Sequence, residues 1–219
     1  MTDSVRERLV DAAFSRFKES GFERTTVDHI AERAGVGRTT FFRHFGSKEQ
    51  VIFPDHDGLL AAIRSRLSTS RPETAVVAVS EAARGVLEHY LAEGERARER
   101  YALTRTVAAL RDRERAGIQQ YERLFAEFIH GWLGGAPETA LRTQLLANAV
   151  VTAHNHVLRG WLRREVEDPQ VAFDTAMAEV STLFDVTPQR VSSLSGTTVV
   201  LLRSGKDLEQ LRTKIESLL

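Results

Sequence analysis

The sequence predicts an all-α fold, and three observations favour it. The five prolines lie at positions 54, 72, 137, 169 and 188, so long stretches between them are free of this helix-breaking residue. Within those stretches, apolar residues recur at the three- and four-residue spacing of one helical face. Several stretches also begin at a residue type that caps helices and end at glycine. With 219 residues, the chain is long enough for one large domain or two smaller ones.

Three short helices are predicted in the first fifty residues. The first covers residues 4–20 and ends at Gly21, which can adopt the left-handed conformation that stops a helix. Thr25, followed three residues later by Asp28, forms a capping-box pattern that opens the second. A Gly-Val-Gly sequence separates the second helix from the third, at residues 36–45. Three short helices at this spacing have the layout of a helix-turn-helix motif.

The predicted helices lengthen toward the middle of the chain. Ser47 caps the start of a further helix, which Pro54 breaks. The helix starts again at Asp55 or Asp57 and runs toward residue 69. Further helices are expected at residues 76–90, 95–110, 111–133, 138–165 and 169–186.

The last thirty residues have a different pattern. Residues 197–202 (TTVVLL) form a short β-like run, and residues 207–218 form an amphipathic helix. We therefore divide the chain into a helix-turn-helix DNA-binding domain at 1–47, a ligand-binding and dimerisation domain at 48–187, and a C-terminal extension at 188–219 that has no assigned role.

Composition excludes several classes of protein. The absence of cysteine rules out disulfides, thiolate metal sites and cysteine nucleophiles. No metal-ligand pattern, glycine-rich phosphate loop or spaced nucleophile and base is present, so we expect neither an enzyme nor a bound metal or cofactor. The charged N-terminus lacks the apolar run of a signal peptide, and no segment reaches the roughly 18 apolar residues of a membrane span. These features predict a cytoplasmic protein without membrane contact.

The third predicted helix carries the residue types that read DNA. Net charge is zero, yet residues 24–48 hold five basic residues against two acidic ones. Arg38 can bind a guanine edge bidentately, and Thr39 or Thr40 can contact a base, a thymine methyl group or a phosphate. The helix starts near residues 25 and 47 can bind phosphates. The predicted DNA contacts are Thr25, Thr26, Gly37, Arg38, Thr39, Thr40, Phe42, Arg43, His44 and Lys48.

Residues 5–52 resemble the N-terminal domain of the TetR family of bacterial regulators. The resemblance is carried by TTV at 25–27, IA at 30–31, AGV at 34–36, TTFFRHF at 39–45 and SKE at 47–49. It implies a homodimeric, all-helical repressor whose N-terminal domain binds operator DNA and whose other helices enclose an effector pocket. It also implies that the last two long helices pair with those of the second copy in a four-helix bundle.

Two positions depart from the usual pattern of the family. Position 42 is Phe instead of Tyr, so a hydroxyl contact to phosphate is missing and only ring packing remains. Position 37 is Gly where a capping Ser or Thr is common, which costs only a few tenths of a kcal/mol.

The helix at 138–165 is apolar on most sides, which predicts burial on both flanks. One narrow sector carries polar residues among leucines, as a ligand site does. The alternative is that these groups hydrogen-bond to neighbouring helices. The predicted ligand-binding residues are Tyr121, Phe125, Asn148, Thr152, Asn155 and Arg159. The opposite sector and the apolar stripe of the next helix are assigned to the dimer interface: Val150, His154, Val157, Trp161, Phe173, Met177, Val180 and Phe184.

The segment at residues 155–163 (NHVLRGWLR) resembles family members thought to respond to acyl-thioesters. This implies an acyl-CoA or another hydrophobic effector, with Arg159 or Arg163 at a phosphate or carbonyl. The sequence His-Asn-His at 154–156 spells a nuclease motif, but consecutive helical residues cannot build that site, and histidines two apart point in different directions. We therefore predict a ligand-responsive transcriptional repressor that binds palindromic operator DNA as a homodimer. The alternative is a helical interaction or ligand-binding protein without DNA binding.

Overall fold

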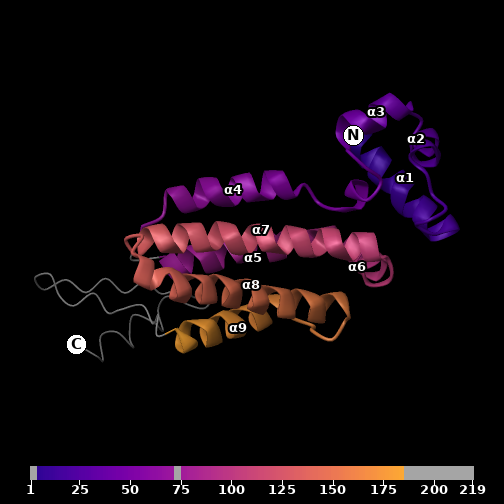
Figure 1. The fold of residues 1–219 in the computed structure, drawn as a ribbon. Coiled ribbons are helices and arrows are strands. Elements are labelled where there is room, and N and C mark those ends of the chain that lie inside the picture. Colours follow the sequence, from indigo (N-terminus) through magenta and orange to yellow (C-terminus); the bar gives the residue numbers. More distant parts are fainter. Residues whose placement is uncertain (1–3, 72–74, 185–219) are drawn as a thin grey trace, which may run out of the picture. The chain divides into compact units, whose positions relative to one another are not determined.

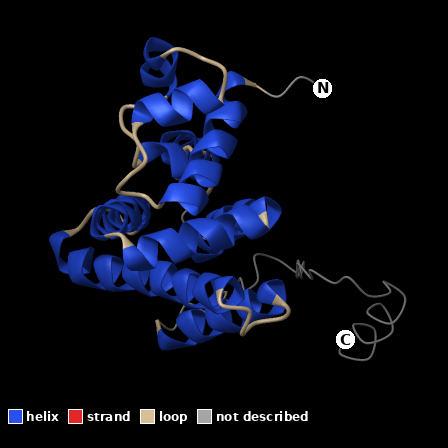
Figure 2. Ribbon diagram, turned by 90° about the vertical axis from the view of Figure 1, so that its right-hand side faces the viewer, coloured by secondary structure: helices blue, strands red, loops and turns tan. Residues whose placement is uncertain are grey.

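A computed structural model describes residues 4–71 and 75–184, which belong to one unit of the chain, residues 1–186. Every regular element in these residues is helical, as Figure 2 shows. The all-α prediction is therefore confirmed for the described part of the chain. The strand predicted at 197–202, the helix at 207–218 and the extension at 188–219 lie outside the described residues.

The N-terminal helices lie together in Figure 1 and are followed by a short 3-10 turn. A capping box between Ser4 and Glu7 opens the first helix, and Gly21 ends it with a φ of 79°. Gly37 caps the third helix without a side-chain hydrogen bond. The elements are α1 (Val5–Ser20), α2 (Val27–Arg33), α3 (Arg38–His44) and η1 (Gln50–Ile52).

The second helix begins one residue later than predicted. Thr26 is its N-cap and accepts a hydrogen bond from the backbone N–H of His29, whose side chain completes the capping box. Thr25 instead points inward, is 1% exposed, and donates its hydroxyl to the backbone carbonyl of Gly21 at 2.8 Å. The predicted pair of Thr25 and Asp28 is therefore wrong, because the first hydroxyl is used to close the preceding turn.

The core of the N-terminal region extends past residue 47. Phe41 and Phe45 pack inward from α3 against α1, and the residues around η1 join the same cluster. The cluster also contains Leu110 from much later in the chain. We call residues 5–53 the N-terminal bundle; its core is separate from the main core of the residues that follow.

The remaining described elements form the helical domain, in which α8 packs against both α7 and α9 (Figure 1). Asp55 caps α4 through the N–H of Gly58, and Asp168 with Pro169 opens α9, as the sequence indicates. The elements are α4 (His56–Ser68), α5 (Ala75–Glu93), α6 (Glu95–Thr106), α7 (Ala108–Trp132), η3 (Pro137–Thr139), α8 (Ala140–Leu162) and α9 (Pro169–Leu183).

The boundary between α6 and α7 differs from the prediction. The break lies at Val107, whose φ of −100° and ψ of 117° are extended, and not near residue 110. Neither glycine nor proline marks this position. Leu103, one turn before the break, and Val107 itself pack against the core cluster of the N-terminal bundle. The break therefore lies at a tertiary contact, and the local sequence does not predict it.

The residues predicted for the dimer interface face the interior of a single chain. Most are buried in the main core, and Trp161 is covered by the guanidinium of Arg98, 4.2 Å from its ring centroid. The stripe packs α8 and α9 against each other and against the rest of the domain. Six of the residues predicted for the interface are buried within the single chain: Val150, His154, Val157, Phe173, Met177 and Val180. Trp161 and Phe184 are only partly buried, and their place in an interface stays a prediction.

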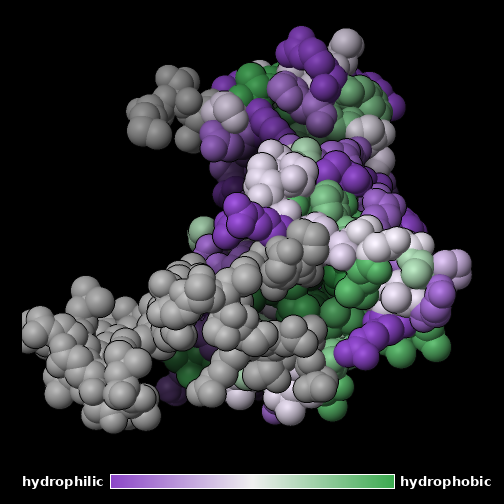
Figure 3. Space-filling model, turned by 90° about the vertical axis from the view of Figure 1, so that its left-hand side faces the viewer, coloured by the Kyte–Doolittle hydropathy of each residue, from purple (hydrophilic) through white to green (hydrophobic). Residues whose placement is uncertain are grey.

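Large apolar side chains are nevertheless exposed on the outer face of α8 and α9. Leu141 is 72% exposed, and Leu145, Val171 and Leu183 are each more than half exposed. Figure 3 shows hydrophobic surface, in green, beside hydrophilic surface in the lower half of the molecule. Within residues 4–71 and 75–184, these apolar side chains therefore remain exposed on α8 and α9.

Candidate functional site

The outer face of α3 presents polar and basic side chains, while Phe41, which is fully buried, fixes the helix to the core. Arg38, Thr39 and Arg43 are exposed, and Thr40 and His44 are partly exposed. The helix therefore has one anchored face and one open face. The open face carries five of the residues predicted to contact DNA.

Arg38 is held in place by two neighbours. Its Nη1 atom lies 2.8 Å from a carboxylate oxygen of Asp28 on α2, and both side chains are well exposed. Its guanidinium also lies 5.1 Å from the ring centroid of Phe42, one turn later on α3. Phe42 is 43% exposed, so its ring supports Arg38 from the solvent side of the helix. This geometry holds the guanidinium against α2 and α3, on the exposed side of both.

Two of the predicted phosphate contacts have their side chains occupied within the protein. Lys48 donates from Nζ to the backbone carbonyls of Phe22 and Thr25, at 2.9 and 3.1 Å, and lies 4.2 Å from the Phe22 ring centroid. Thr25 is buried, as described above. Lys48 therefore joins the segment after α3 to the loop between α1 and α2. Of the two adjacent threonines, Thr25 and Thr26, only Thr26 is exposed.

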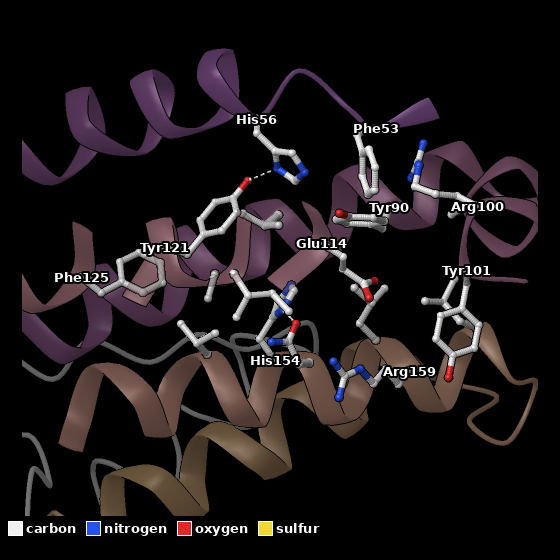
Figure 4. Close-up of a pocket in the computed structure, with 18 residues that line it drawn as sticks. Phe53, His56, Tyr90, Arg100, Tyr101, Glu114, Tyr121, Phe125, His154 and Arg159 are labelled. Carbon is white, nitrogen blue, oxygen red and sulfur yellow. Dashed lines mark hydrogen bonds between the residues drawn. The ribbon is translucent and has the colours of Figure 1, made fainter. Parts of the chain in front are cut away.

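A cavity of about 60 Å³ lies in the helical domain, between α5, α6, α7 and α8 and beside the start of α4 (Figure 4). All three tyrosines of the sequence, Tyr90, Tyr101 and Tyr121, line it. The other lining residues are Phe53, His56, Ala83, Val86, Ala97, Arg100, Glu114, Ile118, Phe125, Val151, His154, Asn155, Leu158, Arg159 and Leu162.

Four of the six predicted ligand-binding residues line this cavity: Tyr121, Phe125, Asn155 and Arg159. The other two do not. Thr152 is exposed, and Asn148 accepts a hydrogen bond from the side chain of Gln144, at 2.8 Å on the same helix. The sector of α8 predicted from its polarity is therefore divided between the cavity and the surface.

Sequence reasoning missed several lining residues, including Glu114 and Tyr90. A signal for Glu114 is present, because it continues the stripe formed on α7 by Ile118, Tyr121 and Phe125 at helical spacing. A carboxylate on an otherwise apolar stripe is unusual and marks a special environment. Tyr90 belongs to the predicted apolar face of α5, where nothing distinguishes a cavity wall from solid core.

His56 connects the cavity to the beginning of α4. One ring nitrogen lies 3.1 Å from the hydroxyl of Tyr121, and the ring packs against Gly117, where an added Cβ would lie 3.6 Å from it. Burial lowers the pKa of His56 to about 4, and the positive charges of Arg100 and Arg113 act in the same direction. Burial raises the pKa of Tyr121. Both groups are therefore neutral near pH 7, so the tyrosine hydroxyl can donate to the imidazole.

Arg100 links the cavity wall to the N-terminal bundle. Its guanidinium forms a bidentate pair with Glu93, at 2.6 and 2.8 Å, and its Nε donates to the backbone carbonyl of Ile52. The side chain is nearly buried. Its charge is thus already balanced by Glu93, and it ties α6 to η1.

Comparison with known proteins identifies two regions of the chain. Residues 9–54 match the family described as "Bacterial regulatory proteins, tetR family", and residues 73–185 match the "MftR C-terminal domain". The HTH-type transcriptional regulator TcmR of Streptomyces glaucescens is 30% identical over 187 residues, which cover 79% of this chain and 81% of the relative.

Solved structures share the fold. The SmeT–triclosan complex aligns with a TM-score of 0.60 at 19% identity, covering 92% of this chain and 100% of that one. The fatty acid degradation regulator FadR from Bacillus halodurans aligns with a TM-score of 0.58 at 18% identity, covering 82% and 96%. No helix in the described residues combines the length and apolar character needed to cross a membrane.

Proposed function

Because the chain belongs to the TetR family of transcriptional regulators, we propose that it is a ligand-responsive repressor that binds a palindromic operator as a homodimer in the cytoplasm. A small molecule that enters the cavity releases it from DNA. The exposed face of α3, with Arg38 oriented by Asp28 and Phe42, is the observation that carries this proposal.

The division of roles on α3 follows from groove chemistry. Arg38 leaves Asp28 and hydrogen-bonds a guanine edge, while Thr39 and Thr40 contact bases or phosphates near the start of the helix. Arg43 and His44, in the last turn, reach the phosphate backbone. Phe42 lacks a hydroxyl for phosphate and acts through its packing against Arg38. When Arg38 leaves Asp28 for guanine, one exposed ion pair is lost, and the loss of such a pair costs little free energy.

The exposed apolar face of α8 and α9 supports the homodimer. Leu141, Leu145, Val171 and Leu183 are large apolar side chains, each more than half exposed on two neighbouring helices, and apolar side chains that gather at a surface favour a protein–protein contact. Two copies that bury this face against each other hold two α3 helices about 34 Å apart, one turn of duplex DNA.

The cavity supports release by a ligand. Its volume of about 60 Å³ is small beside the roughly 300–1,000 Å³ of pockets that hold drug-sized ligands, so a ligand must spread the helices around it. His56 on α4 and Arg100, bonded to Ile52, connect that wall to the N-terminal bundle. Ligand binding therefore favours a dimer geometry in which the two α3 helices no longer match the operator.

Operator binding tests the role of α3. Fluorescence anisotropy with the upstream region of the chain's own gene measures affinity for wild type, Arg38→Ala and Thr40→Ala. We expect Arg38→Ala to weaken binding by about 1–3 kcal/mol, roughly 5- to 150-fold, and Thr40→Ala to weaken it less. Arg115→Ala, an exposed arginine on α7, is the control and leaves the affinity unchanged. Full affinity in both α3 variants excludes this helix from DNA reading.

Salt dependence separates the repressor from a ligand-binding protein without DNA binding. Affinity of a DNA binder falls steeply between low and high salt, since phosphate contacts release counterions. A helical interaction protein shows no sequence-selective binding at any salt concentration.

Sedimentation analysis tests the homodimer. Leu141→Glu places a charge on the proposed interface, and we expect it to convert dimers into monomers while the helical circular dichroism is unchanged. Val77→Glu is a matched control, because Val77 is 56% exposed and belongs to α5, which is not part of the proposed interface. Dimers that survive Leu141→Glu and Leu145→Glu together contradict this interface.

A further inference from the structure

The cavity is polar at one end and apolar at the other. Glu114 lies two helical turns before Tyr121 on α7, about 10 Å along the axis, and Phe125 lies one turn further. On α8, Arg159 lies toward Glu114, and His154 lies between Arg159 and the Phe125 end in Figure 4. A ligand that fills the cavity therefore meets charge at one end and apolar walls at the other.

His154 is a polar side chain in the apolar half of the cavity. Its side chain is 7% exposed, and its Nδ1 atom lies 3.3 Å from the amide oxygen of Asn155. An amide oxygen only accepts hydrogen bonds, so Nδ1 carries the proton and Nε2 is the acceptor of the neutral ring. That Nε2 atom is buried and has no hydrogen-bond partner among the residues that the structure describes. An unpaired buried acceptor of this kind is costly unless a ligand satisfies it.

Glu114 is a second acceptor without a partner. Its carboxylate lines the cavity and forms no hydrogen bond or ion pair with residues 4–71 or 75–184. Arg100, which also lines the cavity, is already bound to Glu93, while Arg159 is exposed and solvated. Burial raises the pKa of Glu114 more than the nearby arginines lower it. The carboxylate is thus poorly solvated and available to a hydrogen-bond donor.

The walls of the cavity around these two acceptors are rich in aromatic rings. Phe53, His56 and the three tyrosines lie around the same space in Figure 4. Flat rings gain contact area and favourable edge-to-face geometry from another ring more than from a flexible alkyl chain. The hydroxyl of Tyr121 is already occupied by His56.

We propose that the cavity binds an aromatic molecule that donates two hydrogen bonds, one to Nε2 of His154 and one to the carboxylate of Glu114. Phenolic hydroxyl or aromatic amino groups are suitable donors. An unbranched acyl chain donates no hydrogen bond and leaves His154 unpaired, so this chemistry favours a hydroxylated aromatic effector over the acyl-CoA that the resemblance of residues 155–163 implies. The proposal rests on the proposed function only in naming this ligand as the effector.

Titration calorimetry on the full chain with matched probes tests the donor requirement. A dihydroxynaphthalene supplies two donors on a flat two-ring frame, and it binds by widening the cavity of about 60 Å³. The dimethoxynaphthalene with the same substitution pattern keeps the rings and removes both donors. We expect the dihydroxy probe to bind at least about tenfold more tightly than the dimethoxy probe, and decanoate to bind more weakly still. Equal affinity of the two naphthalenes, or failure of the dihydroxy probe to bind at millimolar concentration, overturns the proposal.

Two variants assign the donors to their acceptors. His154→Phe and Glu114→Met each remove one acceptor at similar volume, and each lowers the ratio of the two affinities by about threefold to tenfold. The matched changes His156→Phe and Asp112→Met, at exposed positions on the same two helices, leave the ratio unchanged. Glu114 is partly exposed, so its variant tests the proposal even where His154→Phe fails to fold. An unchanged ratio in both cavity variants overturns it.

Operator binding by the ligand-free chain is measured in parallel. If the chain fails to bind DNA but retains the preference for the dihydroxy probe, the proposed function is wrong and the ligand assignment stands. If the chain binds DNA and shows no preference, the ligand assignment is wrong and the repressor remains.

Discussion

The N-terminal bundle and the helical domain differ in how closely local sequence determines which side chains face outward. In α3, the predicted anchors Phe41 and Phe45 are buried and the predicted DNA-contacting face is open. In α8 and α9, the stripe assigned to a second copy is the core of a single chain. The same helical periodicity thus identified the inner face of α3, whereas on α8 and α9 it did not separate the face that packs within the chain from a face open to a second copy.

The difference follows from the number of neighbours of each helix. A short helix at the surface packs on one side only, so its apolar residues identify the inner face. The helix α8 packs against α5, α7 and α9, and it has apolar residues on most sides. Periodicity then shows that two faces are apolar but not which one meets the same chain. Leu141 and Leu145, interpreted as the surroundings of a ligand site, are the exposed apolar residues instead.

The largest expected effect tests whether the stripe on α9 belongs to the core. Phe173 is fully buried, faces His154 on α8 and lies beneath the guanidinium of Arg84. Because truncation leaves a cavity, Phe173→Ala should lower the free energy of unfolding by about 3–5 kcal/mol. Urea denaturation at fixed protein concentration measures it. Leu133→Ala, at a leucine that is 45% exposed and lies outside α8 and α9, is the control and costs less than about 1 kcal/mol.

The opposite outcome would support the prediction that Phe173 lies in the dimer interface. If Phe173→Ala left the unfolding of the chain unchanged and only raised the concentration needed for dimers, Phe173 would lie between subunits and not within one.

The second effect concerns pH and separates the buried histidines of the helical domain from exposed ones. Burial lowers the pKa of both His56 and His154 to about 4, against about 6.5 when the chain is unfolded. Between these values the unfolded state binds more protons, so stability falls as pH falls from about 6.5 toward 4. Protonation linked to each histidine should lower the free energy of unfolding by about 2 kcal/mol between pH 7 and pH 5.

His154→Phe removes one of these two contributions. The loss of unfolding free energy between pH 7 and pH 5, followed by urea denaturation, should then shrink by about half. The matched variant His156→Phe alters an exposed histidine on the same helix and should keep the full dependence. A wild-type chain equally stable at pH 5 and pH 7 would contradict burial of both imidazoles in neutral form.

Sequence predicted the helical fold and the open face of α3, on which Arg38 is exposed as expected. Its contact with DNA stays a prediction. Sequence did not predict the break at Val107 or the cavity-lining Tyr90, because contacts between distant segments decide both. His154 shows the limit most clearly: the sequence predicts it in the dimer interface, whereas in the structure it faces the cavity and Phe173 on α9 of its own chain.

The smallest expected effect concerns the N-terminal bundle. Its N-cap on α2 was predicted at Thr25 but lies at Thr26. Thr26→Ala removes the hydroxyl that accepts the N–H of His29 and should lower the unfolding free energy by about 1 kcal/mol. Asp28→Ala should cost less than about 0.5 kcal/mol, since the carboxylate pairs only with the exposed Arg38. Urea denaturation of the two variants ranks them. A larger loss in Asp28→Ala than in Thr26→Ala would contradict Thr26 as the main cap of α2, because a first-turn carboxylate acting through an exposed ion pair and the helix dipole contributes at most about 1 kcal/mol.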